Sequence, residues 1–202
     1  MRKLFVIGMA AAACLTFAAS KAMAADIPIT GLKLIIVDKI ASTGIAKVVY
    51  VAKDGAVSKG TGTNVATVSS QVDISFDAED GSFVNPSGAN WLVNKDTVAK
   101  YVNKNAPTGG GTKVSVVKPG KLLKNVGKNL GDNPIDISSA PTGPVDVVYT
   151  VNNGGVFRHC TAFDGPTCSH KSIAAGTGWK LTCKGNASPV ACPSSPSGAF
   201  ID

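Results

Sequence analysis

The sequence predicts an all-β protein: an antiparallel β-sandwich of about ten short strands with a disulfide-stapled C-terminal segment. Three observations predict it. Apolar residues alternate at the period of a β-strand, and no run of them repeats at helical spacing. Glycine (22 residues) and proline (11 residues) interrupt the chain at short intervals, as turns require. Four of the five cysteines lie in the last 43 residues, where disulfides would hold a segment that has few apolar residues.

The strands can be assigned in chain order. Residues 71–76 (QVDISF) alternate cleanly, and their three apolar side chains share one face, as a half-buried strand requires. An Asn-Asn-Gly-Gly turn predicts a hairpin over 145–163, because Asn and Gly tolerate the positive φ of tight turns. The predicted strands are 32–39, 47–53, 65–68, 71–76, 97–102 (a strand or one helical turn), 113–117, 121–126, 145–151, 156–163 and 179–183, with turns at 41–44, 80–81, 86–88 and 118–120.

Residues 1–24 have the pattern of an export signal. Two basic residues precede an apolar run over 4–19, and residues 22–24 (AMA) match the small-x-small cleavage pattern. The run is shorter than the ~20 residues that span a membrane. We therefore expect a secreted or periplasmic protein without a membrane span. Residues 25–202 are predicted to form a single β-sandwich domain, with a subdivision near 138–144 as the alternative.

The charge of the chain argues against nucleic acid as a partner. Without the three basic residues of the leader, 17 of the 20 Lys and Arg face 13 Asp and Glu, and only Arg158 of these 17 is an arginine. Nucleic-acid readers favour the planar fork of Arg. The densest basic run, over 113–128, is interpreted as a solvated face because Lys121 and Lys124 fall on opposite sides of a strand. Carbohydrate or another surface protein is the expected kind of partner.

No enzyme or cofactor motif is present. The Gly-rich segments 60–62 and 109–111 do not match a phosphate-binding loop, and no cofactor is expected. No G-x-S-x-G motif announces a serine hydrolase. An acidic stretch is a secondary calcium candidate, although its spacing does not match a calcium loop and no metal is the primary expectation. The residues of this stretch are Asp73, Asp77, Glu79 and Asp80.

Trp91 and Tyr101 are the candidates for ligand binding. Trp91 follows a turn-forming run, and an exposed aromatic ring there would stack on a sugar. The alternative is that Trp91 closes the end of the sandwich, since large aromatic residues are usually well buried. Trp179 is predicted to be a core residue, because it alternates with Leu181 and Cys183 on one strand face.

The four clustered cysteines predict two disulfides. An even number in an exported chain is typical of disulfides, and the spacings lack a zinc pattern. His159 and His170 are then expected at the surface. The spacing leaves nested, local and crossed pairings open, because the loop-closure entropies differ too little to decide. The cysteines are Cys160, Cys168, Cys183 and Cys192.

Several segments of the chain resemble a known class of domains. They are the predicted strands 32–39 (LKLIIVDK) and 47–53, the segment VSVVKPGKLLK, and the sequence VFRHCTAF followed by Cys192-Pro193. They resemble an uncharacterised class of bacterial exported β-sandwich domains over most of residues 30–193. The resemblance implies the pairs Cys160–Cys192 and Cys168–Cys183, and it implies no activity. The expected function is a secreted, non-enzymatic binding or structural module. The alternatives are an extracellular polysaccharide hydrolase or lyase using Asp73 and Asp77, or a subunit of a cell-surface assembly.

Overall fold

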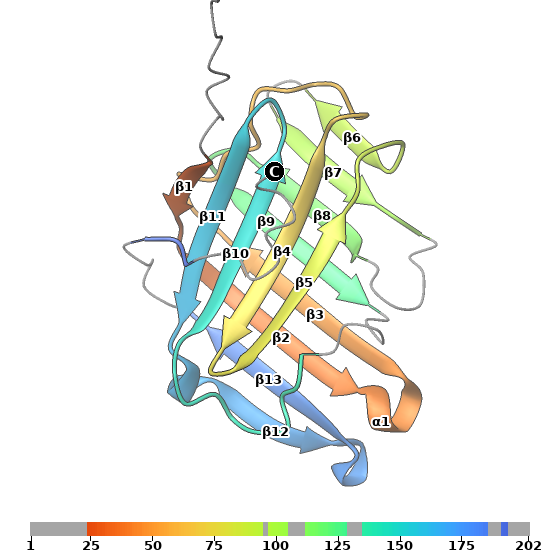
Figure 1. The fold of residues 1–202 in the computed structure, drawn as a ribbon, viewed down its shortest axis with the longest axis vertical. Helices are drawn as coiled ribbons and strands as arrows, with labels where there is room; N and C mark the ends of the chain where they lie inside the picture. Colours follow the sequence, from red (N-terminus) through yellow and green to blue (C-terminus); the bar gives the residue numbers. More distant parts are fainter. Residues whose placement is uncertain (1–23, 95–96, 105–111, 129–134, 186–190, 194–202) are drawn as a thin grey trace, which may run out of the picture.

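Two β-sheets packed face to face make up the fold (Figure 1). The computed structural model describes residues 24–94, 97–104, 112–128, 135–185 and 191–193. Thirteen strands and three short helical turns lie in these ranges. The predicted fold class is confirmed. The predicted leader falls on residues outside the described ranges apart from Ala24, so it stays a prediction.

The smaller sheet has five strands in the order β1-β11-β10-β4-β5. Only β1 pairs in parallel, beside β11, and the other pairs are antiparallel. Strands that lie before and after residues 138–144 are therefore neighbours in one sheet. The bounds are β1 Ala25–Pro28, β4 Ser69–Phe76, β5 Glu79–Asn85, β10 Val145–Asn152 and β11 Val156–Phe163.

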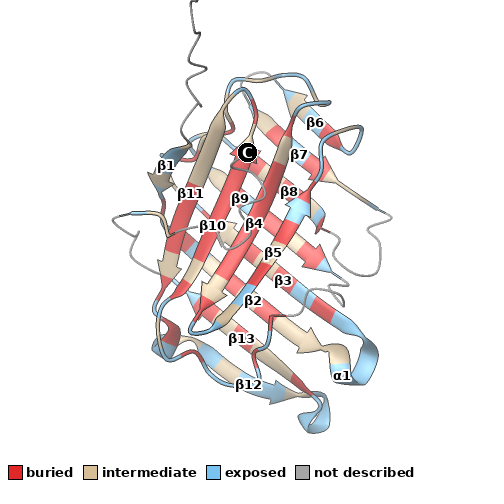
Figure 2. Cartoon of the chain, in the orientation of Figure 1, coloured by how far each residue is buried: buried red, intermediate tan, exposed pale blue. Residues whose placement is uncertain are grey.

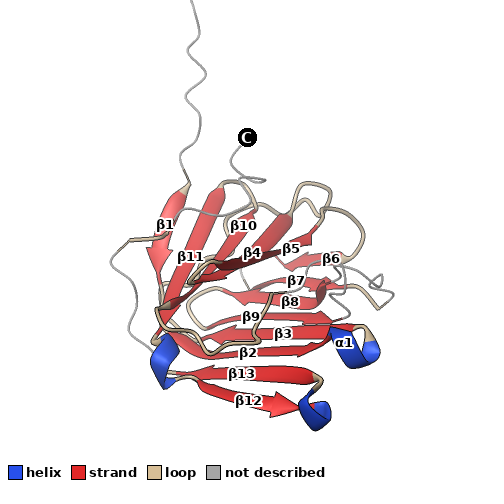
Figure 3. Ribbon diagram, turned by 60° about the horizontal axis from the view of Figure 1, so that its bottom comes forward, coloured by secondary structure: helices blue, strands red, loops and turns tan. Residues whose placement is uncertain are grey.

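The larger sheet has eight strands in the order β12-β13-β2-β3-β9-β8-β7-β6, all of them antiparallel (Figure 3). A one-turn helix, α1, joins β2 to β3, and two 3-10 turns flank β12. The bounds are β2 Gly31–Lys39, α1 Ile40–Thr43, β3 Ile45–Ala52, β6 Trp91–Asn94, β7 Val98–Val102, β8 Thr112–Lys118, β9 Leu122–Lys128, η1 Gly165–Thr167, β12 Ser169–Ile173, η2 Ala174–Gly176 and β13 Gly178–Lys184.

The core lies between the two sheets, because each strand turns its alternate apolar side chains toward the other sheet. Burial is concentrated in the middle strands, and the exposed residues gather at α1, β12 and the strand ends (Figure 2). The predicted inward face of β4 is confirmed, but the strand is not half-buried as predicted, because Gln71 and Asp73 on its other face are buried too. The largest fully buried side chains are Tyr50, Tyr149, Phe83, Phe163, Ile29, Leu34, Ile36, Ile74, Leu123, Ile137 and Leu181.

A segment without regular structure, residues 135–144, closes one end of the sandwich. Ile135 and Ile137 are buried in the core. At the β4–β5 turn, Asp77 accepts hydrogen bonds from the backbone N–H groups of Thr142 (3.0 Å) and Gly143 (3.1 Å). The His170 ring, stacked on Trp179, is 2.8 Å from the Ile137 carbonyl oxygen. The segment is thus attached to both sheets.

Both disulfides implied by the resemblance are confirmed. Cys160 on β11 is bonded to Cys192, with a Cα–Cα distance of 5.3 Å, and this bond holds residues 191–193 against the outer face of the five-stranded sheet. Cys168 is bonded to Cys183 on β13, with a Cα–Cα distance of 4.4 Å. The second bond lies within the span of the first.

Three local predictions are wrong. Residues 65–67 form a turn and Val68 only precedes β4, since neither valine pairs in a sheet and the Asn64 side chain accepts a hydrogen bond from the Ala66 N–H. The predicted turn at 80–81 is part of β5, because Gly81 leaves room for Ile135 to pack over that strand. His159, expected at the surface, is fully buried.

Candidate functional site

The acidic residues of the calcium candidate are not gathered into a site. Asp73 lies buried on β4, where the side chains of Gln71 (2.6 Å) and Ser82 donate to its carboxylate. The carboxylate of Asp77, at the β4–β5 turn, accepts hydrogen bonds from Thr142 and Gly143. Among the described residues, no group of three or more Asp, Glu, His or Cys side chains is arranged to hold a metal ion. These carboxylates stabilise the β4–β5 hairpin and its contacts.

The same geometry weakens the hydrolase alternative. The backbone N–H and hydroxyl of Thr142, together with Gly143, hold the pKa of Asp77 below its usual value. A general acid needs a raised pKa at neutral pH. A hollow of about 180 Å³ is lined by Asp77, Glu79 and Asp136 but not by Asp73. The two carboxylates proposed for proton transfer therefore do not share a site.

Trp91 and Tyr101 are buried, so the exposed ring expected for sugar stacking is wrong. Trp91 is 4% exposed and Tyr101 is 2% exposed. They form a cross-strand pair on the core side of β6 and β7, with ring centroids 5.4 Å apart. The indole N–H of Trp91 donates to the Pro86 carbonyl oxygen at 2.8 Å. The alternative, in which Trp91 closes the end of the sandwich, is confirmed.

His159 is buried and is held by the backbone on both sides. Its Nε2 accepts a hydrogen bond from the Ser58 N–H at 2.9 Å, and its Nδ1 is 3.2 Å from the Tyr149 carbonyl oxygen. Burial lowers the pKa of His159 to about 4. The neutral ring therefore links the loop before β4 to β11.

A buried hydroxyl network connects the two sheets. The Tyr50 hydroxyl on β3 donates to Thr161 on β11 at 2.9 Å. The Tyr149 hydroxyl contacts Ser115 on β8 and donates to Ser70 on β4 at 3.0 Å. Burial raises the pKa of Tyr149 to about 12, so the hydroxyl stays protonated. This network lies inside the core and fixes how the sheets pack.

A different arrangement covers the outer face of the eight-stranded sheet. In the strand register, β-branched side chains from five adjacent strands lie directly beside one another on this face. All five are half-buried. The hydroxyl residues Thr182 and Ser169 extend the line over β13 and β12. We call the five residues the apolar row: Ile35, Val49, Val126, Val114 and Val102.

Lysines flank the apolar row on both sides. On β9, for example, Lys124 and Lys128 lie two residues before and two residues after Val126, on the same face. Strand pairing aligns such lysines across the sheet, interrupted by single valines. The first lysine row is Lys171, Lys180, Lys47 and Lys128, and the second lysine row is Lys184, Lys33, Lys124 and Lys100.

Nothing acidic among the described residues lies on this outer face. Asp38 of β2 is in register with the core residue Ala46, and its carboxylate accepts from the Ile40 N–H at 2.8 Å. The ion pair found in the described ranges joins Arg158 to Asp26 at 3.0 Å on the other sheet. Among the residues that the structure describes, no carboxylate pairs with the two lysine rows, so their positive charge is not neutralised there.

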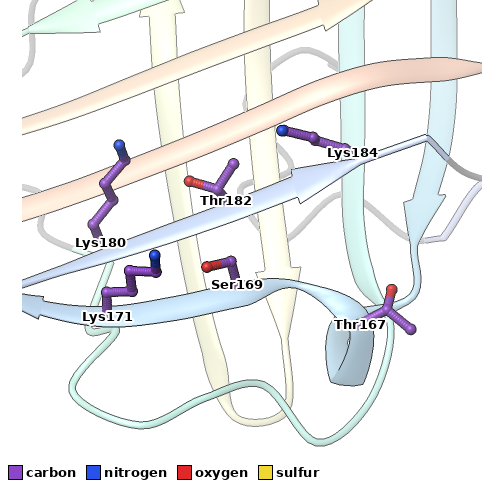
Figure 4. Close-up of a pocket in the computed structure, with 6 residues that line it drawn as sticks. All are labelled: Thr167, Ser169, Lys171, Lys180, Thr182 and Lys184. Carbon is purple, nitrogen blue, oxygen red and sulfur yellow. The ribbon is translucent and has the colours of Figure 1, made fainter.

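The face is hollowed at both ends. At β12–β13, a hollow of about 260 Å³ is lined by three lysines and three hydroxyl residues. Figure 4 shows Lys171, Lys180 and Lys184 on the same side of this hairpin, around Ser169 and Thr182. At β6–β7, a hollow of about 510 Å³ is lined by residues that include Leu92, Lys100, Val102 and Lys104. The apolar row runs between the two hollows.

Sequence reasoning missed this face because its lysines come from six strands that are far apart in the chain. Lys121, which led to the solvated interpretation of the basic run, lies in the β8–β9 turn, while Lys124 and Lys128 belong to the face. A signal was present in the spacing. A lysine, a short central residue and a second lysine at alternate positions occur in both 124–128 and 180–184.

No family model matches the sequence, and no curated protein or solved structure is detectably similar to it. Within the described ranges, no helix has the length and apolar character needed to cross a membrane.

Proposed function

We propose that this protein is an exported, non-enzymatic binding module that holds an anionic partner on the outer face of its eight-stranded sheet. The observation that carries the proposal is the segregation of charge: eight lysines line the apolar row, and no acidic residue of the described chain shares their face. Such a field attracts polyanions and raises their association rate. The predicted leader and the two disulfides, which persist in oxidising compartments, support export.

The two alternatives from the sequence have less support. The hydrolase alternative lacks a shared site for Asp73 and Asp77. Strand addition to a surface assembly needs an uncovered apolar edge strand. Among the four edge strands, β1 and β6 have only four residues each and β12 is almost entirely polar. The fourth, β5 (EDGSFVN), exposes a single large apolar side chain, Val84. The exposed lysine face is the feature best suited to binding.

The test is binding of the purified, non-reduced protein to a panel of anionic probes: polygalacturonate, dextran sulfate, polyglutamate and phosphatidylglycerol vesicles. We expect at least one probe to bind with an affinity that falls as salt is raised. A variant with four reversals on the face, K33E/K47E/K124E/K128E, should lose this binding while keeping its circular dichroism spectrum. No binding to any probe, or equal binding by the variant, would refute the proposed function.

A further inference from the structure

This inference rests on the proposed function and names the ligand class. The geometry points to a linear acidic polysaccharide, one chain of which lies along the apolar row with its acidic groups against both lysine rows. Three features of the face carry it: the cross-section of the face, the chemistry of its floor and the hollows at its ends.

The cross-section is that of a trough. Two lysines placed either side of one central residue are four residues apart, which is about 13 Å of strand. Lysine has a long side chain, whereas the Val and Ile side chains between the rows are short. The lysines therefore form two charged walls above an apolar floor. A single extended chain with acidic groups along both edges can reach both walls at once.

The floor chemistry favours sugar rings over nucleic-acid bases. Pyranose rings present C–H groups on their flat faces, and the aliphatic apolar row can receive these without a polar partner. The positions of the face that the structure describes carry no aromatic residue, and Trp91, which borders the hollow at β6–β7, is only 4% exposed. Single-stranded nucleic acids, in contrast, are bound by stacking of bases on aromatic rings. The flat face also carries Lys in place of the Arg that reads bases.

The recessed floor also argues against a lipid bilayer. Proteins that bind in the membrane interface bury an apolar face in the headgroup and acyl boundary. Here the apolar row is half-buried and lies below the level that extended lysine side chains reach. A flat bilayer would meet the ammonium groups first, and the apolar row would gain no contact.

The two ends of the trough offer polar groups for sugar hydroxyls and acids. Ser169, Thr182 and Thr167 line the hollow at β12–β13 with three lysines. From β12 to β7 the trough crosses seven strands, and six spacings of about 4.8 Å give a length of about 29 Å. One sugar unit covers roughly the distance between two neighbouring strands. The trough therefore suits an oligosaccharide of about six units.

The experiment is calorimetric titration with linear oligogalacturonates from disaccharide to octasaccharide, with neutral cello-oligosaccharides of the same lengths as the uncharged comparison. We expect affinity to rise with length, to level off near the hexasaccharide, and to be absent for the neutral series. Two variants test the walls separately: K47E/K128E in the first lysine row and K33E/K124E in the second. Each should weaken hexasaccharide binding by about tenfold, since each removes two charge contacts and adds repulsion.

The matched control is K53E/K121E, which changes the net charge equally at two exposed lysines outside both rows. It should bind within about twofold of the unmodified protein at physiological salt, where distant charges are screened. Equal weakening by this control, or an affinity that does not depend on length, would overturn the trough. Binding to vesicles or polyglutamate without binding to oligogalacturonates or dextran sulfate would overturn the ligand class and leave the proposed function standing. Failure of every anionic probe would end both proposals.

Discussion

At the scale of single residues, His159 makes the stability of the folded protein depend on pH. Its pKa, about 4 in the folded state, is lower than the value of about 6.5 in an unfolded chain. The unfolded chain therefore binds more protons between these values. The contribution of His159 to stability is complete above about pH 6.5 and is lost as the pH falls toward 4.

We expect this loss to be about 3 kcal/mol in the free energy of unfolding, since each pKa unit corresponds to about 1.4 kcal/mol. The measurement is urea unfolding at several pH values between 7 and 4, for the unmodified protein and for H159Q. Carboxylates titrate in both proteins. The difference between the two slopes of unfolding free energy against pH therefore isolates the contribution of the histidine. Identical slopes would show that His159 titrates as it does in the unfolded chain.

Asn125 shows a second effect at this scale. Its side chain is fully buried on the core side of β9, and neither its Nδ2 nor its Oδ1 has a hydrogen-bond partner in the described structure. The hydroxyl of Tyr50, the residue opposite Asn125 on β3, donates its hydrogen bond to Thr161 and not to Asn125. A buried polar group without a partner reduces stability. We therefore expect the buried amide of Asn125 to lower the stability of the folded protein.

At the scale of elements, the 135–144 segment depends on a close backbone contact. A Cβ at Gly165 would meet the Gly143 carbonyl oxygen and lie 2.9 Å from Pro141. We predict that G165A lowers the free energy of unfolding by about 1–3 kcal/mol, because the backbone of the segment must shift away. Denaturant unfolding measures the effect.

The control for this prediction is G55A. A Cβ at Gly55 meets nothing within 4 Å, and its φ is not in the left-handed region. The change should alter stability by no more than about 0.5 kcal/mol. If G165A behaved like G55A, the segment would not be packed against the β11–β12 connection.

The elements also show what sequence patterns can predict. The β-branched strands and the Asn-Gly hairpin were predictable, because alternation and turn chemistry are local. β12 (SHKSI) and β1 (ADIP) were missed, since neither has an apolar alternation and both are formed by pairing with one neighbour at a sheet edge. β5 was missed because Gly81 suggested a turn. The lysine face was missed for a related reason: its rows run across strands, perpendicular to the chain.

At the scale of the whole molecule, the two disulfides contribute unequally. Each disulfide stabilises the fold because it reduces the conformational entropy of the unfolded chain. From sequence separations of 32 and 15 residues, this stabilisation is about 3.7 kcal/mol for Cys160–Cys192 and about 3 kcal/mol for Cys168–Cys183. We expect C160A/C192A and C168A/C183A to lose about these amounts in guanidinium unfolding without reductant.

Reductant supplies the internal control, because it should destabilise the unmodified protein by more than it destabilises either double variant. A thiol titration of the non-reduced, unfolded protein should find none of the four cysteines free. Four free thiols, or double variants as stable as the unmodified protein, would contradict the contribution of the disulfides to stability.

The nesting of these bonds sets a problem for oxidative folding. Cys160 and Cys168 are only eight positions apart and leave a ribosome or translocation channel first, so the shortest available loop joins two cysteines that are not partners in the native protein. Neither native pair can form until its second cysteine, Cys183 or Cys192, has been synthesised. Reaching them requires thiolate attack on any early bridge, a slow exchange unless an isomerase catalyses it. We therefore expect the yield of correctly oxidised protein to depend on such a catalyst in the compartment where the chain matures.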